Sequence, residues 1–148
     1  MTTPFLIPDL RHDEGLRLEA YPDPLSGGAP WTIGYGHTGP DVTPETVWTE
    51  DQAEAALASD VARVCAGVNE HISWWRRMSD LRQDVLANMA FNMGLNRLLQ
   101  FRRMLDHARA GDFGAAADDM LASVWARQVR RRAARLARQM ATGAHQTC

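Results

Sequence analysis

The sequence predicts an α+β protein in which a small antiparallel sheet lobe and a mainly helical lobe surround a cleft. Residues 15–40 combine strand-favouring side chains with frequent glycine and proline, whereas apolar residues recur at helical spacing from residue 50 onward. A strand region this short cannot bury a core alone and must pack on helices. The 148 residues fit a single domain, with a strand-rich lobe over about 13–60 and a helical lobe over about 61–148 that also takes the N-terminal helix.

The first part of the chain predicts a short helix followed by tight hairpins. Residues 1–12 are interpreted as a helical lead-in that Pro4 and Pro8 interrupt. The strand region then contains strand-favouring residues separated by turn-forming ones. The first set is Tyr21, Trp31, Thr32, Ile33 and Tyr35, and the second is Pro22, Pro24, Gly27, Gly28, Pro30, Gly34, Gly36 and Gly39.

Capping signals predict where the later helices begin and end. Thr49, followed by two acidic residues and Gln52, resembles a capping box at a helix start. Ser79 marks a second start, and Gly94 ends the apolar stripe that follows it. Three further helices are expected, over residues 98–110, 113–122 and 128–142.

The composition favours a soluble globular protein without a metal centre. No run approaches the ~18 apolar residues that a membrane span needs. Met1–Asp9 have neither a positively charged region nor an apolar core, so we expect no signal peptide and synthesis in the cytoplasm. Neither the two cysteines, Cys65 and Cys148, nor the five histidines show the spacing of metal ligands, and no cofactor is expected.

Charge is distributed unevenly along the chain. Residues 1–60 carry a net charge of −9 and residues 61–148 carry +7, and every basic side chain is arginine. This asymmetry reflects either coding bias with solvated helix faces or an anionic partner of the basic half. The most basic segment, 127–138, is interpreted first as a solvated helix and alternatively as a contact for anionic membranes or lipopolysaccharide. No nucleic acid is expected, because no aromatic residues lie among these arginines.

Two carboxylates stand out in the first part of the chain. Glu14 follows the helical lead-in, and Asp23 lies in a turn nine positions later. A turn between them could bring both to opposite walls of one groove, which is the arrangement that glycoside hydrolysis needs. Two acidic residues in a turn-rich segment are more often solvent-exposed residues without a catalytic role, so the spacing alone is a weak signal.

A family resemblance strengthens the signal. Glu14, Asp23 and the following Thr-Ile-Gly-Tyr-Gly-His segment, residues 32–37, look like the signature of the phage-type lysozymes, the endolysins of the T-even phage lysozyme group. Residues 54–61 resemble the interdomain helix of that family, and residues 87–94 resemble its central buried helix. Further matches follow in the same order, at 104–105, 111–116, 123–125, 128, 132–135 and 142–143. The resemblance implies a lysozyme-like fold.

The resemblance also implies catalytic roles. Glu14 would be the general acid, Asp23 the second carboxylate, and Thr32 would help to hold the attacking water. One departure is that eight residues separate Asp23 from Thr32, where the family usually has five. The extra residues most simply lengthen the hairpin turn and leave Thr32 in place.

Two supporting pairs follow from the same matching. Arg132 aligns with an arginine that pairs with the catalytic glutamate and would orient Glu14, although it also belongs to the basic segment 127–138. His37 and Asp60 match an ion pair between the strand region and the long helix, with a role in stability rather than catalysis.

Sugar contacts are expected along the groove, from aromatic faces and side-chain amides. Phe91 and Asn92 match family residues at the cleft, and Tyr35 and Trp31 lie close in sequence to Thr32. Core packing is an equal alternative for Trp31 and Phe91 and the favoured interpretation for Trp125.

The function implied is that of an endolysin. The chain would hydrolyse the β-1,4 bond between N-acetylmuramic acid and N-acetylglucosamine in peptidoglycan, as a monomer and without metal or cofactor. It would wait in the host cytoplasm until a holin-type pore releases it to the periplasm and cell wall. The alternatives are a lytic transglycosylase acting on the same bond, a membrane-disrupting protein acting through residues 127–138, and a cleft that binds wall glycan without cutting it.

Overall fold

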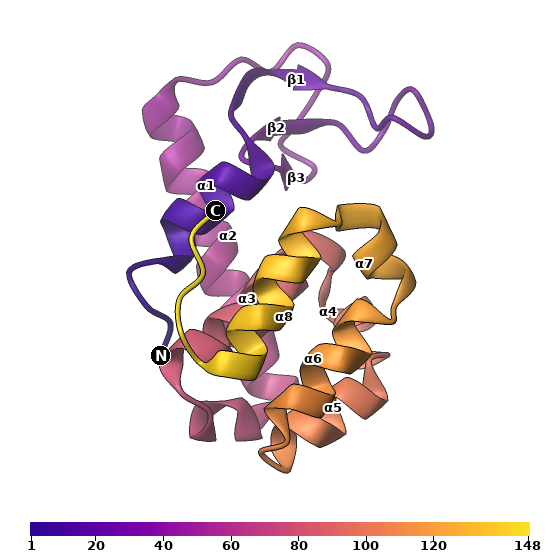
Figure 1. Cartoon of the computed structure of the whole chain (residues 1–148). Helices are drawn as coiled ribbons and strands as arrows, with labels where there is room; N and C mark the ends of the chain where they lie inside the picture. The colour runs from indigo at the N-terminus through magenta and orange to yellow at the C-terminus, as the bar shows by residue number, and fades with distance from the viewer. The chain divides into compact units, whose positions relative to one another are not determined.

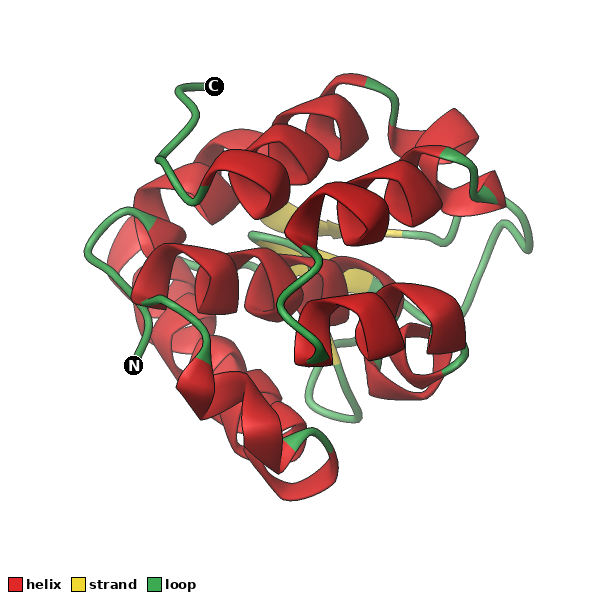
Figure 2. Cartoon of the chain, turned by 60° about the horizontal axis from the view of Figure 1, so that its bottom comes forward, coloured by secondary structure: helices red, strands yellow, loops and turns green.

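The computed structural model describes all residues, 1–148, as two compact units. One unit, Ile7–Arg63, contains the strands and is called the strand unit; the other combines Met1–Leu6 with Val64–Cys148 and is called the helical unit. The N-terminal helix falls mainly in the strand unit, whereas the sequence analysis grouped it with the helical lobe. The α+β class is confirmed, and strands form only a small part of the chain (Figure 2).

The strand unit is built on a three-stranded antiparallel sheet with the order β1-β2-β3. Pro8 is the third residue of the N-terminal helix, where a backbone N–H has no helical partner to lose, so this proline does not interrupt the helix. Tyr21 pairs with Thr32 across the first hairpin, and Thr32 pairs with Thr38 across the second. The elements are α1 (Leu6–Glu14), β1 (Arg17–Tyr21), β2 (Thr32–Gly34) and β3 (His37–Thr38) (Figure 1).

The long helix α2 (Glu50–His71) begins at the predicted capping box. Thr49 Oγ1 accepts a hydrogen bond from the Gln52 backbone N–H at 3.2 Å, and the Thr49 N–H donates to Gln52 Oε1 at 2.8 Å. Two of the N–H groups that a helix start leaves without partners are satisfied in this way. The residues of α2 are divided between the strand unit and the helical unit.

The helical unit contains more breaks than the sequence predicts. Its elements are a 3₁₀ helix η1 (Ser73–Arg77), α3 (Asp80–Met93), α4 (Leu95–Leu99), α5 (Arg102–Arg109), α6 (Phe113–Leu121), α7 (Val124–Val129) and α8 (Arg131–Thr142). The single helix expected over 98–110 is wrong, because the backbone leaves helical geometry at Phe101. The ring of Phe101 packs edge-on against that of Trp125, with 6.3 Å between the ring centres. The single helix expected over 128–142 is also wrong, because Arg130 adopts a φ of 36° between α7 and α8.

The core of the helical unit lies around α3 and α8. Residues 83–90 of α3 are all buried, and α8 packs against α6 and α3 with the side chains of Ala133, Leu136, Ala137 and Met140 buried (Figure 1). Arg82 of α3 caps the C-terminal end of α8. Its Nε donates to the Met140 carbonyl at 2.7 Å, and its Nη2 donates to the Ala141 carbonyl at 3.0 Å. The apolar face of α8 is therefore used within the protein.

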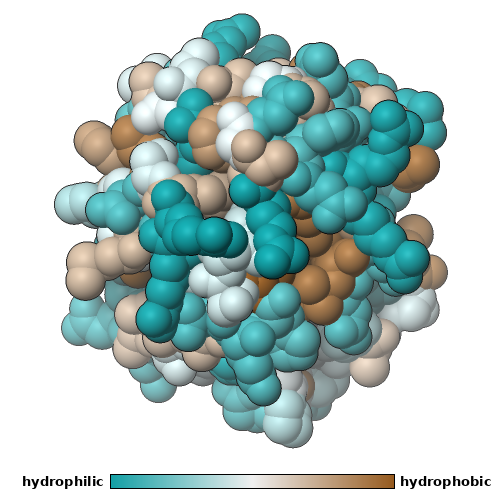
Figure 3. All heavy atoms as spheres, turned by 90° about the horizontal axis from the view of Figure 1, so that it is seen from below, coloured by the Kyte–Doolittle hydropathy of each residue, from teal (hydrophilic) through white to brown (hydrophobic).

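The face of the molecule shown in Figure 3 is covered mainly by hydrophilic side chains, with apolar areas between them, the most evident of which lies right of the centre. None of the helices has both the length and the apolar character that crossing a bilayer requires.

Candidate active site

Glu14 is the last residue of α1 and lies against the turn between β2 and β3. A methyl group added to Gly36 would lie 3.2 Å from Glu14 Oε2 and 3.4 Å from its Cδ. Gly36 also has a φ of 73°, which side-chain-bearing residues rarely adopt. Glycine at this position therefore permits both the turn and the close approach of the Glu14 carboxyl.

Asp23 is held by the loop that follows β1. Its Oδ2 accepts hydrogen bonds from the backbone N–H groups of Leu25, at 3.1 Å, and Ser26, at 2.9 Å. The Asp23 N–H donates to the Gly28 carbonyl at 2.9 Å, and the Gly27 N–H donates to the Asp23 carbonyl at 2.8 Å. The carboxylate therefore has one oxygen engaged by the loop, while Oδ1 accepts no hydrogen bond.

Thr32 keeps its place in the sheet despite the longer connection. It is the first residue of β2 and the cross-strand partner of Tyr21, which lies two positions before Asp23. The additional residues project from the sheet as the long loop between β1 and β2 (Figure 1). Asp23 and Thr32 thus lie near the two ends of one loop, in the same unit as Glu14.

Tyr21 and Arg17 are neighbours of this site that the sequence analysis did not single out as functional. Burial raises the pKa of Tyr21, and the negative charge of Glu14 raises it further. The Arg17 guanidinium lies 4.6 Å from the centre of the Tyr21 ring. Both residues lie on β1, but the strand register shifts between them, so strand alternation alone would not have placed Tyr21 beside Arg17.

His37 and Asp60 lie together within the strand unit. His37 Nδ1 is 2.7 Å from Asp60 Oδ2, and Nε2 is 3.2 Å from Asp41 Oδ2, a partner that the sequence analysis missed. Asp60 Oδ1 also accepts a hydrogen bond from Arg63 Nη2 at 2.5 Å. The hydrogen bond with His37 lowers the pKa of Asp41. The cluster connects β3, the following turn and α2.

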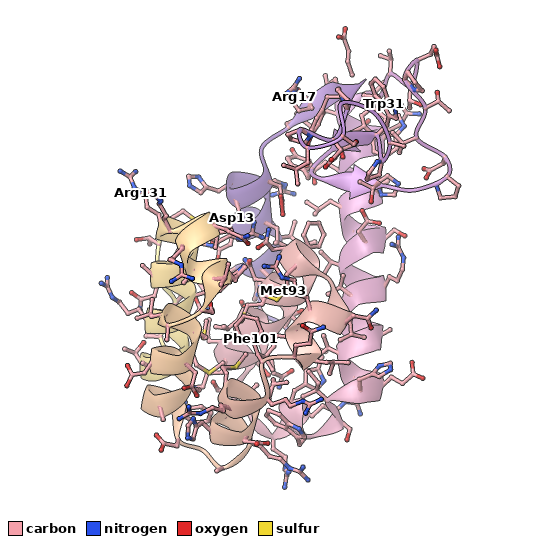
Figure 4. The ribbon with its side chains drawn as sticks, turned by 90° about the vertical axis from the view of Figure 1, so that its right-hand side faces the viewer. Asp13, Arg17, Trp31, Met93, Phe101 and Arg131 are labelled. Carbon is pink, nitrogen blue, oxygen red and sulfur yellow. The ribbon has the colours of Figure 1, made fainter.

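Tyr35 and Trp31, the aromatic residues considered for sugar contacts, both interact within the strand unit or are partly buried in it. The Tyr35 hydroxyl donates to Glu54 Oε1 at 3.0 Å, and Glu54 is bound in turn by Arg11 through two hydrogen bonds of 2.8 Å. The hydroxyl proton of Tyr35 is thus used within the strand unit, and the sugar contact expected for Tyr35 stays a prediction. Trp31 is half-buried in the strand unit, near the end of the long loop (Figure 4).

The helical unit contains the other predicted residues. Asn92 Oδ1 accepts a hydrogen bond of 2.7 Å from Nε1 of Trp125, which is 2% exposed and hence belongs to the core as expected. Phe91 is half-buried one position earlier in α3. Arg132 is buried and donates from Nε to Asn88 Oδ1 at 2.9 Å. Arg132 and Glu14 belong to different units, and their pairing stays a prediction.

The structure offers no obvious place for a metal ion. No three side chains of histidine, cysteine, aspartate or glutamate are grouped as ligands. Cys65 is half-buried, and burial raises the pKa of its thiol, so the reactive thiolate is disfavoured.

Comparison with known proteins gives a family match and several relatives. The family described as phage lysozyme matches residues 11–140. An endolysin of Bacillus phage B103 is 37% identical over 108 residues, which are 73% of this chain and 40% of that protein. An endolysin of Acyrthosiphon pisum secondary endosymbiont phage 1 is 31% identical over 112 residues, 76% of this chain and 72% of that protein.

A third relative is named as a spike protein. The pre-baseplate central spike protein of Enterobacteria phage T4 is 31% identical over 159 aligned positions, covering 90% of this chain and 27% of the spike protein. The chain thus spans less than half the length of two of these three relatives.

Proposed function

Because this chain belongs to the phage lysozyme family, we propose that it is an endolysin-type muramidase that hydrolyses the β-1,4 bond between N-acetylmuramic acid and N-acetylglucosamine in peptidoglycan. The observation that carries the proposal is the geometry of the strand unit. Glu14 ends α1 against the Gly36 turn, and Asp23 and Thr32 lie near the two ends of one loop.

In the proposed reaction Glu14 donates a proton to the glycosidic oxygen as the bond breaks. Asp23 uses Oδ1 to stabilise the developing positive charge on the sugar or to assist water, while Oδ2 stays with the loop. Thr32 positions the water, and Arg132 orients Glu14. Sugar rings contact Tyr35, Phe91 and Asn92. No step in this scheme needs a metal or a cofactor.

The proposal includes where the protein acts. We place it in the host cytoplasm until a holin-type pore admits it to the periplasm and cell wall, where it acts as a monomer. A contact with anionic lipid or lipopolysaccharide is proposed only as a peripheral one. The apolar face of α8 is buried in the helical unit, and the exposed arginines of the basic segment are Arg127, Arg130, Arg131 and Arg138.

Replacement of Glu14 by glutamine tests the proposal. Glutamine keeps the size of the side chain but cannot donate the proton, so Glu14→Gln should lower the clearing of purified, lipid-free peptidoglycan by roughly 100-fold or more. The parent protein and Ser59→Ala, a change on the exposed side of α2, serve as active controls.

The products decide between the alternatives. Mass spectrometry of the muropeptides released by the parent should show hydrated reducing ends, whereas anhydro-muramyl ends would identify a lytic transglycosylase. Clearing that persists undiminished in Glu14→Gln would contradict the assignment of the general acid. If the parent binds the lipid-free glycan but releases nothing, the protein is a glycan-binding module and not a hydrolase.

A further inference from the structure

We infer that the loop between β1 and β2 is a rigid mount that orients the Asp23 carboxylate, and that Ser26 is its positioning residue. The inference rests on the proposed hydrolysis and adds a residue to that site. It concerns residues 22–31, which are longer than the corresponding turn expected for the family and contain no regular secondary structure.

The mount holds Asp23 at three points. The Leu25 and Ser26 N–H groups donate to Oδ2, which fixes the rotation of the carboxylate and leaves Oδ1 as the oxygen without a hydrogen bond. The Asp23 N–H and carbonyl are bound as well, to the Gly28 carbonyl at 2.9 Å and the Gly27 N–H at 2.8 Å. The backbone and the side chain of Asp23 are thus fixed by the same short segment.

Ser26 closes this segment. Its Oγ donates to the Ala29 carbonyl at 2.8 Å and accepts a hydrogen bond from the Gly28 N–H at 3.2 Å. Because the Gly28 carbonyl is the acceptor for the Asp23 N–H, the serine hydroxyl connects the far side of the loop back to the carboxylate. Ser26 itself supplies one of the N–H groups on Oδ2.

The loop depends on these hydrogen bonds because little packing holds it. Leu25 is 98% exposed, and Ser26 and Gly27 are exposed too, whereas Trp31 at the end of the loop is half-buried. The exposed part of the loop, residues 24–27, has no buried side chain to fix its shape, so its internal hydrogen bonds are its main local constraint. Loss of the serine hydroxyl should therefore let Asp23 sample other orientations, and small errors in orientation reduce the rate of catalysis strongly.

The test compares Ser26→Ala with Ser26→Thr in the full chain, using soluble glycan strands purified from peptidoglycan. Ser26→Ala should lower kcat roughly tenfold and leave KM within about twofold, because the loop orients a catalytic group and is not itself a sugar contact. Ser26→Thr retains the hydroxyl and should recover most of the lost kcat. The matched control is Thr46→Ala, which removes another turn hydroxyl that accepts a backbone N–H, here from Thr43 at 2.8 Å, and should keep the parental kcat.

A second measurement tests the mount without activity. Amide exchange followed by NMR should show the Leu25 and Ser26 N–H groups protected in the parent and exchanging faster in Ser26→Ala, while the amides of α2 are unchanged. A Ser26→Ala protein with parental kcat, or a Ser26→Thr protein as slow as the alanine variant, overturns the inference alone. A parent protein that releases no reducing ends contradicts the proposed function itself.

Discussion

At the residue scale, Gly36 shows how one position can serve both the backbone and the site. The turn between β2 and β3 needs a positive φ, and Glu14 Oε2 lies only 3.2 Å from the position that a Cβ atom on Gly36 would take. Gly111 has a similar φ of 82°, but nothing lies within 4 Å of the position of its missing Cβ. A comparison of substitutions at these two glycines therefore distinguishes the effect of backbone strain from the effect of crowding the Glu14 carboxyl.

Alanine at these two positions should give different results. Gly36→Ala should destabilise the protein by about 1–2 kcal/mol and also lower activity, because the new methyl group displaces the Glu14 carboxyl. Gly111→Ala should cause a similar loss of stability while leaving activity on peptidoglycan at the parental level. Thermal unfolding and glycan-release assays on both variants check this, and equal activities would show that Gly36 acts on the backbone only.

Tyr21 illustrates a second point at the residue scale. The sequence predicts that Tyr21 lies in a strand, and this is confirmed, since Tyr21 pairs with Thr32. Its partial burial and the negative charge of Glu14 raise its pKa, and the Arg17 guanidinium lies 4.6 Å from the centre of its ring. Such proximity depends on how α1 and β1 pack, so no local pattern in the sequence contains it.

At the scale of elements, the cluster around His37 connects the sheet to α2. The imidazole lies between Asp60 on the helix and Asp41 in the turn after β3, and Arg63 faces Asp60 from the next turn of α2. Both histidine nitrogens face carboxylates, so both can donate only when the ring is protonated. The His37–Asp60 pair was predicted from the sequence, and Asp41 and Arg63 extend this pair to a cluster of four charged or titratable side chains.

His37→Asn should make the free energy of unfolding less dependent on pH in acid. The pKa of Asp41 is lowered in the folded protein, mainly by the His37 hydrogen bond, so its contribution to stability is present above its ordinary pKa of 3.8 and is lost as the pH falls through the lower folded value. Asp41 is exposed, and the effect should stay below about 1 kcal/mol. Denaturant unfolding of both proteins from about pH 5 down to about pH 2 checks this, and parallel curves would contradict it.

The helix breaks also belong to the scale of elements. Apolar residues continue at helical spacing across Gln100–Phe101 and across Arg130, because the helices on both sides face one core. Neither break has a glycine or proline to mark it. By contrast, the starts at Thr49 and Ser79 are confirmed, since a cap is made by residues three positions apart.

At the scale of the whole molecule, the charge asymmetry leaves exposed arginines in the helical unit. Arg127 and Arg131 lie on α7 and at the start of α8, and Arg131 points away from the helix (Figure 4). Arg132, in the same segment, is buried against Asn88. Some arginines of the basic segment therefore carry surface charge, whereas Arg132 belongs to the interior of the helical unit.

The paired change Arg127→Gln and Arg131→Gln tests the proposed lipid contact. Each exposed basic residue near an anionic surface contributes about 1 kcal/mol, so the double variant should bind phosphatidylglycerol vesicles roughly tenfold or more weakly at low salt. Its activity on lipid-free peptidoglycan should equal that of the parent. Vesicle sedimentation is the measurement, with phosphatidylcholine vesicles as the control, and unchanged binding of the double variant would reject the contact.

The sequence by itself determined the α+β class, a strand-rich region followed by helices, the helix starts at Thr49 and Ser79, and the Glu14, Asp23 and Thr32 signature, because these depend on neighbours within a few positions or on the order of motifs along the chain. Only the tertiary structure decided where Phe101 and Arg130 break the helices, that Tyr21 lies near Glu14, and that the long loop folds back to hold one oxygen of Asp23. The physical reason is the range of the interactions. Caps and turn residues are satisfied locally, whereas breaks and side-chain environments follow from contacts between segments that the chain brings together only on folding.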